Sequence, residues 1–292
     1  LDCTCSGIQH YSGLLRSEGM GAMVNLVDND QPQDIYSMVM ARVLARLRDS
    51  DDPRAGKWLA LQPDRSLAKP IVMTLPYSAT PIAYYHACWA WALDRADDML
   101  GPGAWPHKAG AMSAMHFMAQ ILHAEARALI GHAEQAMEYL RALGRAAGKE
   151  DVALRWVTPS GLLVQQMYPN TQDKRIRLRY LSDVRLDVRC KVDDLGLDQQ
   201  RMARGLSPNV VHSQDASHMA LVTNHAMSHG VRNLGGIHDC FVTTPAEMKQ
   251  VRNSVRTTFA DLYAASSFDT IVDQLLSQLS SKSKAKLPPR PV

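Results

Sequence analysis

The spacing of apolar residues predicts a chain built mainly from amphipathic helices. Over residues 32–48, apolar side chains recur at the spacing that places them on one face of a helix. They are Ile35, Val39, Val43, Leu44 and Leu47. Comparable patterns predict further helices over residues 8–18, 68–77, 82–100, 111–147 with a break near Gly131, 211–229, 246–265 and 268–280.

Three stretches predict short strands instead, because apolar residues alternate or cluster on either side of a turn. The turns are centred on Ser160-Gly161, Ser182-Asp183 and His238-Asp239. The residues before Gly7 also have strand character. Strands therefore occur early, midway and late in a helix-rich chain. This pattern favours an α+β fold in which distant strands could share one small sheet.

Composition describes an ordinary globular protein. Hydrophobic residues make up 46% and charged residues 21% of the 292 positions, a length that suits one large domain or two ordinary ones. No run approaches the roughly 20 apolar residues of a membrane span. The five cysteines show neither disulfide nor zinc spacing, which favours a reducing compartment. The net charge of +3 does not identify a nucleic-acid binder, and the start at Leu1 within a strand suggests a piece of a longer protein.

Two aspartates at strand ends offer a metal site. Asp2 ends the first predicted strand, and Asp239 lies at the turn between the last two. Magnesium takes one or two carboxylates together with substrate phosphates, and nucleotidyl transfer employs two such ions about 3.5–4 Å apart. Aspartate is also a common turn former, so the residue type alone leaves both interpretations open.

Arg65, Lys69 and Tyr77 lie at helical spacing. In a continuous helix they would form a slowly turning ridge, with two cations suited to phosphates and a phenol about 12 Å beyond Lys69 suited to a sugar or base. Pro70 and Pro76 disfavour a straight helix, so the helix could begin at Lys69-Pro70 and kink before Tyr77. The alternative is an ordinary amphipathic helix with a solvated basic end.

A basic hairpin is predicted over residues 174–191. It carries the basic residues Lys174, Arg175, Arg177, Arg179, Arg185, Arg189 and Lys191, and the acidic residues Asp183 and Asp187. The period of two places the arginines of RIRLR on one face of a strand. Such a ribbon could enter a DNA groove or track a phosphate backbone, or it could be the solvated face of an edge hairpin.

Five motifs occur in a recognisable order along the chain. They are DCTCSGIQHYSGLLRSE, RSLAKPIVMTLPYSAT, RWVTPSGL, HSQDASHM and GGIHDCFVT. Together they resemble motifs of the bacteriophage-type single-subunit RNA polymerases, and similar segments extend from Leu1 to about Leu279. The resemblance implies a polymerase palm, made of a small antiparallel sheet with helices, together with helical fingers. It also implies that the family's N-terminal domain and thumb are absent from this chain.

The resemblance divides the chain into alternating parts. The implied palm comprises residues 1–30 with the first metal motif and 211–280 with the second. The implied fingers are residues 31–150, with a nucleotide-binding helix at about 65–78, and residues 151–210 hold fingers and the basic hairpin, with a promoter-reading loop at about 174–191. The composition of residues 281–292 predicts a mobile tail.

The same resemblance implies a metal centre and a reaction. Asp2 and Asp239 would bind two Mg²⁺ ions, with the backbone carbonyl of Cys3 as a further ligand. The reaction would be template-directed synthesis of RNA on DNA, in which the RNA 3′ hydroxyl attacks the α-phosphate of a ribonucleoside triphosphate. Catalysis would consist mostly of positioning and charge neutralisation, with Asp2, Lys69 and Asp239 as the catalytic residues.

Substrate contacts are implied for five side chains. Arg65 and Lys69 would hold the triphosphate, and Lys69 could protonate the leaving pyrophosphate. Tyr77 would lie at the sugar and, with His212, select ribose over deoxyribose. His238 would lie near the phosphates or the metal site.

The basic hairpin corresponds to a promoter-reading loop in this family. Arg185, Asp187 and Arg189 are therefore expected at or near promoter bases. The partners would be a DNA template and promoter, the RNA product and ribonucleoside triphosphates, with no membrane and a monomeric protein. The place of action would be the cytoplasm of an infected bacterium, or alternatively a mitochondrion. The isolated piece is not expected to transcribe.

Three positions depart from the family pattern. Ser78 replaces a glycine, Pro70 a residue that is often basic, and Cys240 a common serine. A side chain at position 78 could crowd the template base or the substrate. Two other functions stay open, a DNA polymerase of related palm architecture and a catalytically silent nucleic-acid-binding remnant. Tyr77 with HSQD at 212–215 favours RNA synthesis, as does Cys240 where those DNA polymerases would have glutamate.

Overall fold

The computed structural model describes residues 1–100, 110–178, 184–191 and 195–291. The helices are α1 Ser6–Leu15, α2 Glu18–Met23, α3 Ile35–Arg48, α4 Pro53–Ala60, α5 Arg65–Thr74, the 3₁₀ turn η1 Leu75–Tyr77, α6 Pro81–Leu100, α7 Ala111–Leu129, α8 Gly131–Lys149, α9 Gln199–Ser228, α10 Met248–Ala265, α11 Phe268–Leu276 and α12 Ser281–Lys284. The strands are β1 Leu154–Val157, β2 Leu163–Gln166, β3 Thr171–Leu178, β4 Val184–Lys191, β5 Leu234–Ile237 and β6 Cys240–Thr243.

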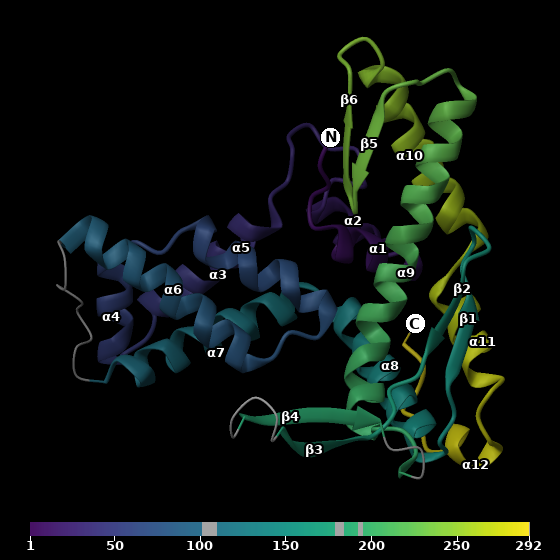
Figure 1. Ribbon diagram of the computed structural model, residues 1–292. Helices are drawn as coiled ribbons and strands as arrows, with labels where there is room; N and C mark the ends of the chain where they lie inside the picture. The colour runs from purple at the N-terminus through teal and green to yellow at the C-terminus, as the bar shows by residue number, and fades with distance from the viewer. Residues whose placement is uncertain (101–109, 179–183, 192–194, 292) are drawn as a thin grey trace.

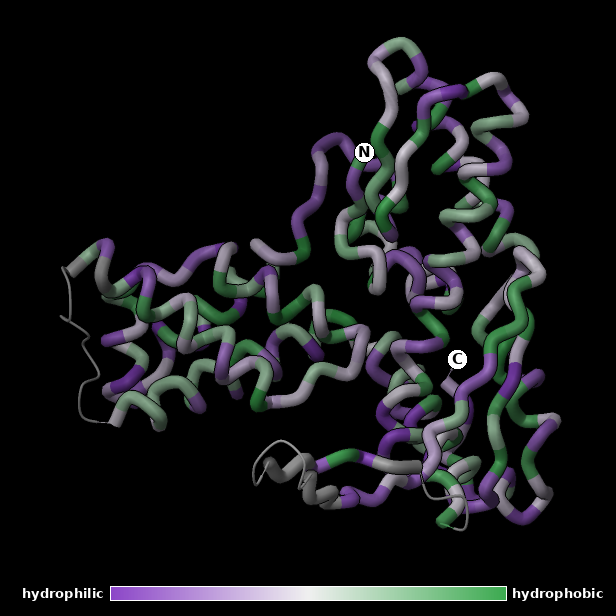
Figure 2. The backbone as a smooth tube through the Cα atoms, in the orientation of Figure 1, coloured by the Kyte–Doolittle hydropathy of each residue, from purple (hydrophilic) through white to green (hydrophobic). Residues whose placement is uncertain are grey.

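Helix α9 is the axis of the structure (Figure 1). An arm made of α3 to α7 projects to one side of it, the β5–β6 hairpin and α10 lie at one end, and α8 with the β3–β4 hairpin lies toward the other. Apolar and polar stretches alternate along the helices in Figure 2, as amphipathic packing requires. In the described part of the chain, no helix combines the length and the apolar character that crossing a membrane demands.

Aspartate caps begin three helices of the arm. Asp34, Asp52 and Asp64 each accept a hydrogen bond from the backbone N–H two residues further on, at 3.1, 2.9 and 2.9 Å. Behind these caps the apolar interior of the arm is continuous with the main core at α1 and α8. Trp58 is fully buried there and donates its indole N–H to the carbonyl of Ala114 at 3.0 Å. The arm is therefore held by helix-to-helix packing and not by a sheet.

Helix α5 begins at Arg65, earlier than the sequence predicted. Pro70, which was also considered as a starting point, lies inside the helix. Its missing backbone N–H removes one hydrogen bond, but the burial of Leu67 and Ile71 on the inner face compensates for the loss. The expected change of geometry before Tyr77 is confirmed, because the chain tightens there into the 3₁₀ turn η1.

Helix α9 begins at Gln199, whereas the sequence predicted a start near 211. Asp198 caps it by accepting hydrogen bonds from two backbone N–H groups of the first turn, at 2.9 and 3.0 Å. Gly205 and Pro208 disfavour a helix locally, so the sequence pattern did not predict this half of α9. Packing against α8 outweighs both residues.

Two glycines allow α8 to approach α9 closely. A Cβ atom at Gly144 would lie 2.5 Å from the carbonyl oxygen of Met202, and one at Gly148 would lie 2.8 Å from the Cα of Gln199. Both obstacles are backbone atoms of α9, which cannot rotate aside as a side chain can. The separation of the two helices therefore depends on glycine at these positions.

The strands form three separate two-stranded antiparallel sheets. The three predicted hairpins are confirmed, but within the described residues they do not share the single small sheet that the sequence suggested. Helices help to cover two of the hairpins. Trp156 of β1 donates its indole N–H to Ser213 of α9 at 3.0 Å, and Phe241 of β6 is buried with Val222 of α9. Of the opening residues, Leu1 pairs with β6.

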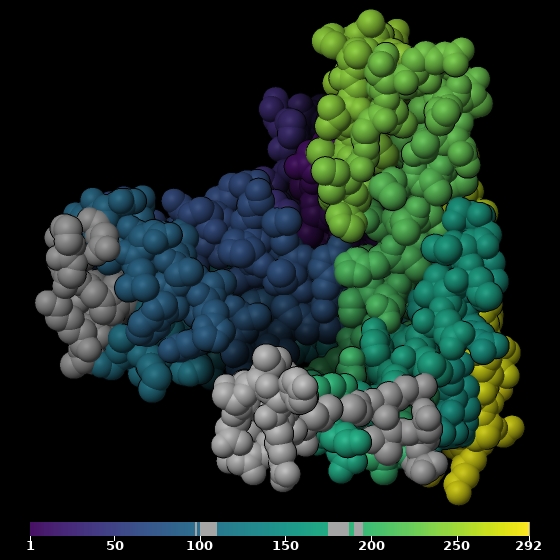
Figure 3. All heavy atoms as spheres, in the orientation of Figure 1, coloured from purple at the N-terminus to yellow at the C-terminus, as the bar shows by residue number. Residues whose placement is uncertain are grey.

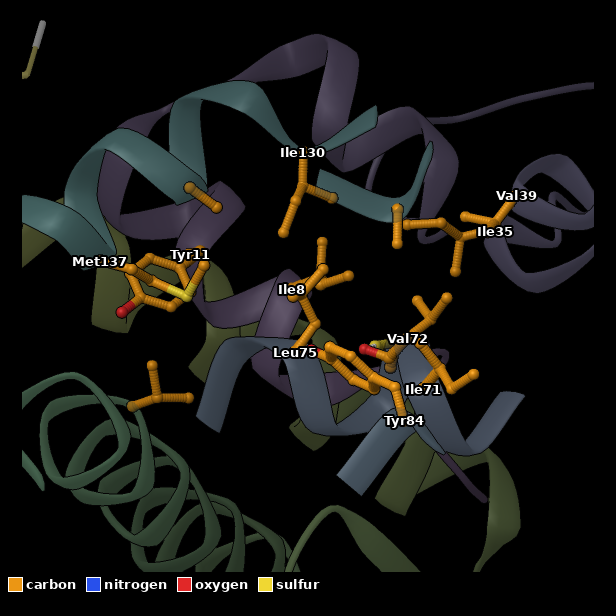
Figure 4. Packing of buried hydrophobic residues seen from close by; sticks show 14 of the residues in the cluster. Ile8, Tyr11, Ile35, Val39, Ile71, Val72, Leu75, Tyr84, Ile130 and Met137 are labelled. Carbon is orange, nitrogen blue, oxygen red and sulfur yellow. Dashed lines mark hydrogen bonds between the residues drawn. The ribbon is translucent and has the colours of Figure 1, made fainter. Parts of the chain in front are cut away.

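The main core lies where α1 meets the arm and α8. In Figure 4, Ile8 and Tyr11 of α1 lie among side chains from the arm and α8, including Val72, Tyr84 and Met137. All five are at most 1% exposed. Helix α1 therefore joins the arm to the body around α9.

The C-terminal segment, for which the sequence suggested mobility, has defined contacts in the structure. It forms the short helix α12, and Ser280 at its start hydrogen-bonds Glu150 through both backbone and side chain. Arg290 then pairs with Asp269 at 2.8 Å and Asp273 at 2.6 Å, which lie one turn apart on α11. This pairing holds the segment against α11.

Replacing Gly144 with alanine is expected to lower the free energy of unfolding by about 1–3 kcal/mol, because the added methyl group must displace the backbone of Met202. This effect opposes the roughly 1 kcal/mol by which alanine favours a helix over glycine. Urea denaturation measures the difference. Gly56→Ala in α4 is the matched control, since nothing lies near its added Cβ, and it should be neutral or stabilising. Equal stabilities of the two variants would contradict the close packing.

Candidate active site

The first residue of the chain and the last of the five motifs meet through a pair of backbone hydrogen bonds. The amino group of Leu1 donates to the carbonyl of Phe241 at 2.8 Å, and the N–H of Phe241 donates to the carbonyl of Leu1 at 2.8 Å. These residues are 240 positions apart in the chain. Asp2 follows Leu1, and Asp239 lies just before β6, so the pairing brings both to one side of the molecule. Both aspartates line the same cavity of about 660 Å³.

The cavity with Asp2 and Asp239 forms an acidic corner of the molecule, and Figure 3 shows the surrounding elements. The helical arm meets the body around α9 at an angle, and the N-terminal segment lies at the corner between them. The cavity itself is lined by α1, α2 and α10 in addition to the two aspartates, with Arg16, Arg252 and Arg256 among its residues.

The turn between β5 and β6 presents His238 and Asp239. Its two central residues connect Ile237 to Cys240, which pair with one another. His238 has a positive φ of 53°, the left-handed conformation that tight hairpin turns demand. Its side chain is 82% exposed. The turn thus projects an imidazole and a carboxylate from the same tip.

Cys3 lies among three carboxylates. Burial raises the pKa of its thiol to about 12, and the charges of Asp239, Asp215 and Asp2 act in the same direction. The thiol is therefore neutral at neutral pH. Oxygen ligands are what this corner provides.

The residues at this corner suit a magnesium ion that takes some of its ligands from water and substrate. In the described part of the chain, no three His, Cys, Asp or Glu side chains are grouped so as to hold an ion by themselves. Magnesium does not need such a group, because it binds one or two carboxylates and completes its shell with water and phosphate oxygens. Asp2 is exposed and Asp239 partly exposed, so both carboxylates are accessible to such an ion.

The sequence did not predict the buried hydrogen-bond network behind the β5–β6 turn. His10 of α1 contacts Asp215 of α9 through Nε2 at 3.3 Å, and its Nδ1 lies 2.5 Å from the hydroxyl of Tyr263 on α10. The second carboxylate oxygen of Asp215 lies 3.9 Å from Nδ1 of His238. Burial alone would raise the pKa of Asp215, but His10, by hydrogen bond and charge, and His238, by charge, lower it below its ordinary value.

The only sequence signal for this network is a carboxylate within the apolar pattern of α9. Asp215 falls among buried positions of the helix, where an ionised side chain requires a partner. Its partner His10 lies 205 positions away, so no local pattern could have identified the pair.

Tyr77 and His212, which the resemblance assigns to the sugar, lie together. Their rings stack with centroids 4.6 Å apart. Burial raises the pKa of Tyr77, and the negative charges of Asp215 and Asp239 raise it further. The Tyr77 ring therefore lies near enough to these two aspartates to be affected by their charge. A Cβ added at Gly7 would lie 3.0 Å from the Tyr77 hydroxyl, so that hydroxyl lies against the first turn of α1.

Arg65 and Lys69, the expected triphosphate contacts, line a different cavity. It has a volume of about 510 Å³ and shares no lining residue with the cavity of the aspartates. Arg65 pairs with Asp34 at 2.6 Å, and its guanidinium lies 4.9 Å from the centre of the Tyr36 ring. Lys69 is exposed, and no described carboxylate forms a salt bridge with it. In this structure the two cations therefore line a pocket of their own on α5.

Ser78 occupies a conformation that glycine adopts more easily. Its φ is 61° and its ψ is 36°, in the left-handed region. Its hydroxyl oxygen is buried, and among the described residues it has no hydrogen-bond partner. Both features indicate local strain beside Tyr77, at the position where the sequence departed from the family pattern.

The β3–β4 hairpin is only partly described. Its register places Asp173 opposite Arg189, Arg175 opposite Asp187 and Arg177 opposite Arg185. Arg189 forms an exposed ion pair with Asp173 at 2.9 Å. The side chain of Arg185, the arginine face of RIRLR and the tip at 179–183 lie outside the described residues. The expected promoter contacts therefore stay predictions.

Comparison with known proteins decides the family. A model of the DNA-dependent RNA polymerase family matches residues 1–289. The chain belongs to the DNA-dependent RNA polymerase family. The resemblance carried by the five motifs is thereby confirmed.

Relatives in this family come from phages and from plant organelles. The chain is 30% identical to the T7 RNA polymerase of Escherichia phage T7 over 338 residues, covering 99% of this chain and 37% of that protein. It is 32% identical to the DNA-directed RNA polymerase of Pseudomonas phage phiKMV, covering 90% of this chain and 32% of that protein. It is 31% identical to the chloroplastic DNA-directed RNA polymerase 3 of Nicotiana sylvestris, covering 99% of this chain and 29% of that protein. The chain thus spans about a third of the length of these polymerases.

Replacing Ser78 with glycine is expected to raise the free energy of unfolding by about 1 kcal/mol. Glycine adopts the left-handed conformation without strain, and the change removes a buried hydroxyl without a described partner. Urea denaturation of the chain measures it. Ser78→Ala separates the two causes, since it removes the hydroxyl and keeps the strained Cβ. A loss of stability in Ser78→Gly would show that the serine side chain contributes an interaction of its own.

Stability is expected to fall as the pH is lowered from about 6.5 to 4, because of His218. Burial lowers the pKa of His218 to about 4, although the ring bonds the carbonyl of Val255 at 3.0 Å. In this window the unfolded chain binds a proton that the folded chain does not. Acid therefore lowers the free energy of unfolding, by up to about 3 kcal/mol. Urea midpoints at the two ends of the window measure the slope. His218→Gln, which can still donate to Val255, should flatten it; an unaltered slope would assign the effect to other groups.

Proposed function

We propose that this chain carries the nucleotidyl-transfer centre of an RNA polymerase that copies DNA into RNA from ribonucleoside triphosphates. The observation that carries the proposal is that Asp2 and Asp239, which are 237 positions apart in the sequence, line one cavity. The backbone pairing of Leu1 with Phe241 holds them there. Family membership supports the same reaction, since the matched phage and plant proteins are named RNA polymerases.

Asp2 and Asp239 are the proposed ligands of two Mg²⁺ ions, with the carbonyl of Cys3 as a third contact. When bound, the ions would supply Lewis-acid activation of the RNA 3′ hydroxyl and neutralise phosphate charge. The carboxylates suit this role because both are accessible and, in the described part of the chain, neither forms a salt bridge with lysine or arginine. Asp215 is different: it is buried and in hydrogen-bond contact with His10, so it is proposed to support the site and not to bind metal.

Substrate contacts are proposed for the residues that the resemblance named. The stacked pair of Tyr77 and His212 would lie at the ribose and select it over deoxyribose. The stacking of the two rings supports this role, as does the effect of the Asp215 and Asp239 charges on the pKa of Tyr77. His238, exposed at the tip of the hairpin, would contact phosphates. Arg65 and Lys69 would hold the triphosphate, and Lys69 would protonate the leaving pyrophosphate. For Arg65 this requires exchange of its partner Asp34 for phosphate.

The proposed division of the chain follows from these roles. The palm would comprise residues 1–30 and 211–280, and the fingers residues 31–150, which include the helical arm. Residues 151–210 would present the β3–β4 hairpin to promoter DNA, with Arg185, Asp187 and Arg189 near the bases. The polymerase would act as a monomer in the cytoplasm of an infected bacterium; the plant organellar relatives keep an organelle as the alternative.

Asp239→Asn and Asp2→Asn are expected to weaken binding of Mn²⁺, used as a paramagnetic substitute for Mg²⁺, to this chain in the presence of a ribonucleoside triphosphate. In a full-length polymerase carrying this sequence, each should reduce ribonucleotide incorporation by a factor on the order of 10²–10³ or more, because a group that stabilises the transition-state charge is lost. Electron paramagnetic resonance and primer extension measure the two effects.

Glu18→Gln is the matched control, because Glu18 lines the same cavity but is not a proposed ligand. It should leave both measurements near the wild-type values. Wild-type activity in the aspartate variants would remove the metal assignment. An inactive wild-type polymerase that still bound nucleic acid would favour the silent remnant that the strain at Ser78 suggests. Faster incorporation of deoxyribonucleotides than ribonucleotides would favour a DNA polymerase.

A further inference from the structure

Three arginines line the cavity that contains Asp2 and Asp239. They are Arg16, at the end of α1, and Arg252 and Arg256 of α10. All three are exposed, and in the described part of the chain none of them forms a salt bridge. Apart from the two aspartates, Glu18 is the one acidic residue of the described lining. We call the three arginines the arginine wall, since they keep a positive charge beside the proposed metal ligands.

The two arginines of α10 have a spacing that suits a nucleic-acid strand. Arg252 and Arg256 are four residues apart, so they lie on one face of the helix, about 6 Å from one another along its axis. Such a spacing fits successive phosphates of one strand, and guanidinium groups bind phosphate oxygens well. Phe241 and Phe259 also line the cavity and offer apolar surface to a sugar or a base.

Arg16 has a backbone conformation that favours glycine. Its φ is 50° and its ψ is 35°, in the left-handed region at the C-terminal end of α1. Helices often end there with glycine, because a Cβ atom is strained in this conformation. Among the described residues, the Arg16 guanidinium has no hydrogen bond or ion pair that would offset the strain. A ligand bound by the guanidinium would supply that compensation.

The residues proposed for the incoming nucleotide lie outside this cavity. Tyr77, His212 and His238 are not part of its described lining, and Arg65 and Lys69 line the separate pocket on α5. In phosphoryl transfer, the attacking and leaving oxygens lie roughly in line, on opposite sides of the phosphorus. The strand that carries the attacking hydroxyl must therefore approach the aspartates from a side that the incoming nucleotide leaves open, and the cavity offers such a side.

We propose that this cavity binds the 3′-terminal part of the RNA strand, with its backbone phosphates on the arginine wall and its 3′ hydroxyl beside Asp2 and Asp239. The inference rests on the proposed function, because it places the second reactant of that reaction. A volume of about 660 Å³ lies in the range of sites that enclose drug-sized ligands, so it suits the end of a strand and not a whole duplex. The arginines bind and orient the strand and touch no reacting atom.

The test measures binding of a short RNA, labelled with fluorescein at its 5′ end, to this chain by fluorescence anisotropy. Arg252→Gln and Arg256→Gln should each weaken binding by about 3–10-fold and lower the slope of log affinity against log salt by roughly 0.7, the value of one phosphate contact in a single strand. Arg16→Gly should weaken binding likewise, but with a thermal midpoint at or above that of the wild type, because glycine relieves the left-handed strain. This variant therefore separates loss of binding from loss of folding.

Arg48→Gln is the matched control, since Arg48 is an exposed arginine of α3 that lines neither cavity. It should keep the wild-type affinity and salt slope. The direction of the strand has its own readout. An RNA with 4-thiouridine at its 3′ end should crosslink on irradiation to α1 or α10, whereas 4-thiouridine at the 5′ end should not.

Wild-type RNA affinity and salt slope in all three arginine variants would overturn this inference, even if the aspartate variants lost Mn²⁺ binding as expected. So would a wild-type chain that bound no RNA, or crosslinking from the 5′ end alone. Variants that bound a ribonucleoside triphosphate less tightly but RNA unchanged would assign the wall to the incoming nucleotide instead. Loss of RNA binding in the arginine variants, with unchanged Mn²⁺ binding in the aspartate variants, would support the RNA site and remove the metal assignment.

Discussion

Helix α1 is buried on nearly every side, and the arrangement of the candidate site depends on that burial. Ile8 packs into the arm, the hydroxyl of Tyr11 bonds that of Ser207 on α9 at 2.7 Å, and His10 bonds Tyr263 on α10. One short helix thus contacts the arm, α9 and α10 at once. Because protein interiors are close-packed, none of these three elements can shift without opening a cavity around α1. The helix therefore holds the Tyr77 hydroxyl, which lies against its first turn, and Asp215 at set positions near the acidic corner.

The carboxylates of this corner differ in how their charge is balanced. Asp215 is buried and in hydrogen-bond contact with His10, whereas Asp2 and Asp239 remain accessible without a salt bridge to a described lysine or arginine. A buried carboxylate needs hydrogen-bond partners to be tolerated, so the histidine network explains why Asp215 can exist within the apolar face of α9. The accessible aspartates without such partners are the ones that gain most from a cation. This contrast, more than the number of acidic residues, separates a supporting role from a ligand role.

The hairpin that carries Asp239 depends on a small core at the end of α9. Val222, Ala226, Val231, Phe241 and Val251 are the buried residues of this core, which joins the end of α9 to the hairpin. The backbone of Phe241 also holds Leu1, so the same core determines where the segment of Asp2 lies.

The sequence by itself determined most helices, all three hairpins and the family, because periodicity and local motifs need no distant contact. The α3 pattern at Ile35, the break at Gly131 and the turn at His238-Asp239 are all present in the structure. Tertiary structure alone decided the first half of α9, since packing at Gly144 overrides local signals against a helix. It also decided the pairing of Leu1 with Phe241 and of His10 with Asp215, more than 200 positions apart. Such pairs have no local signature, because their energy is gained only when the whole chain has closed around α1.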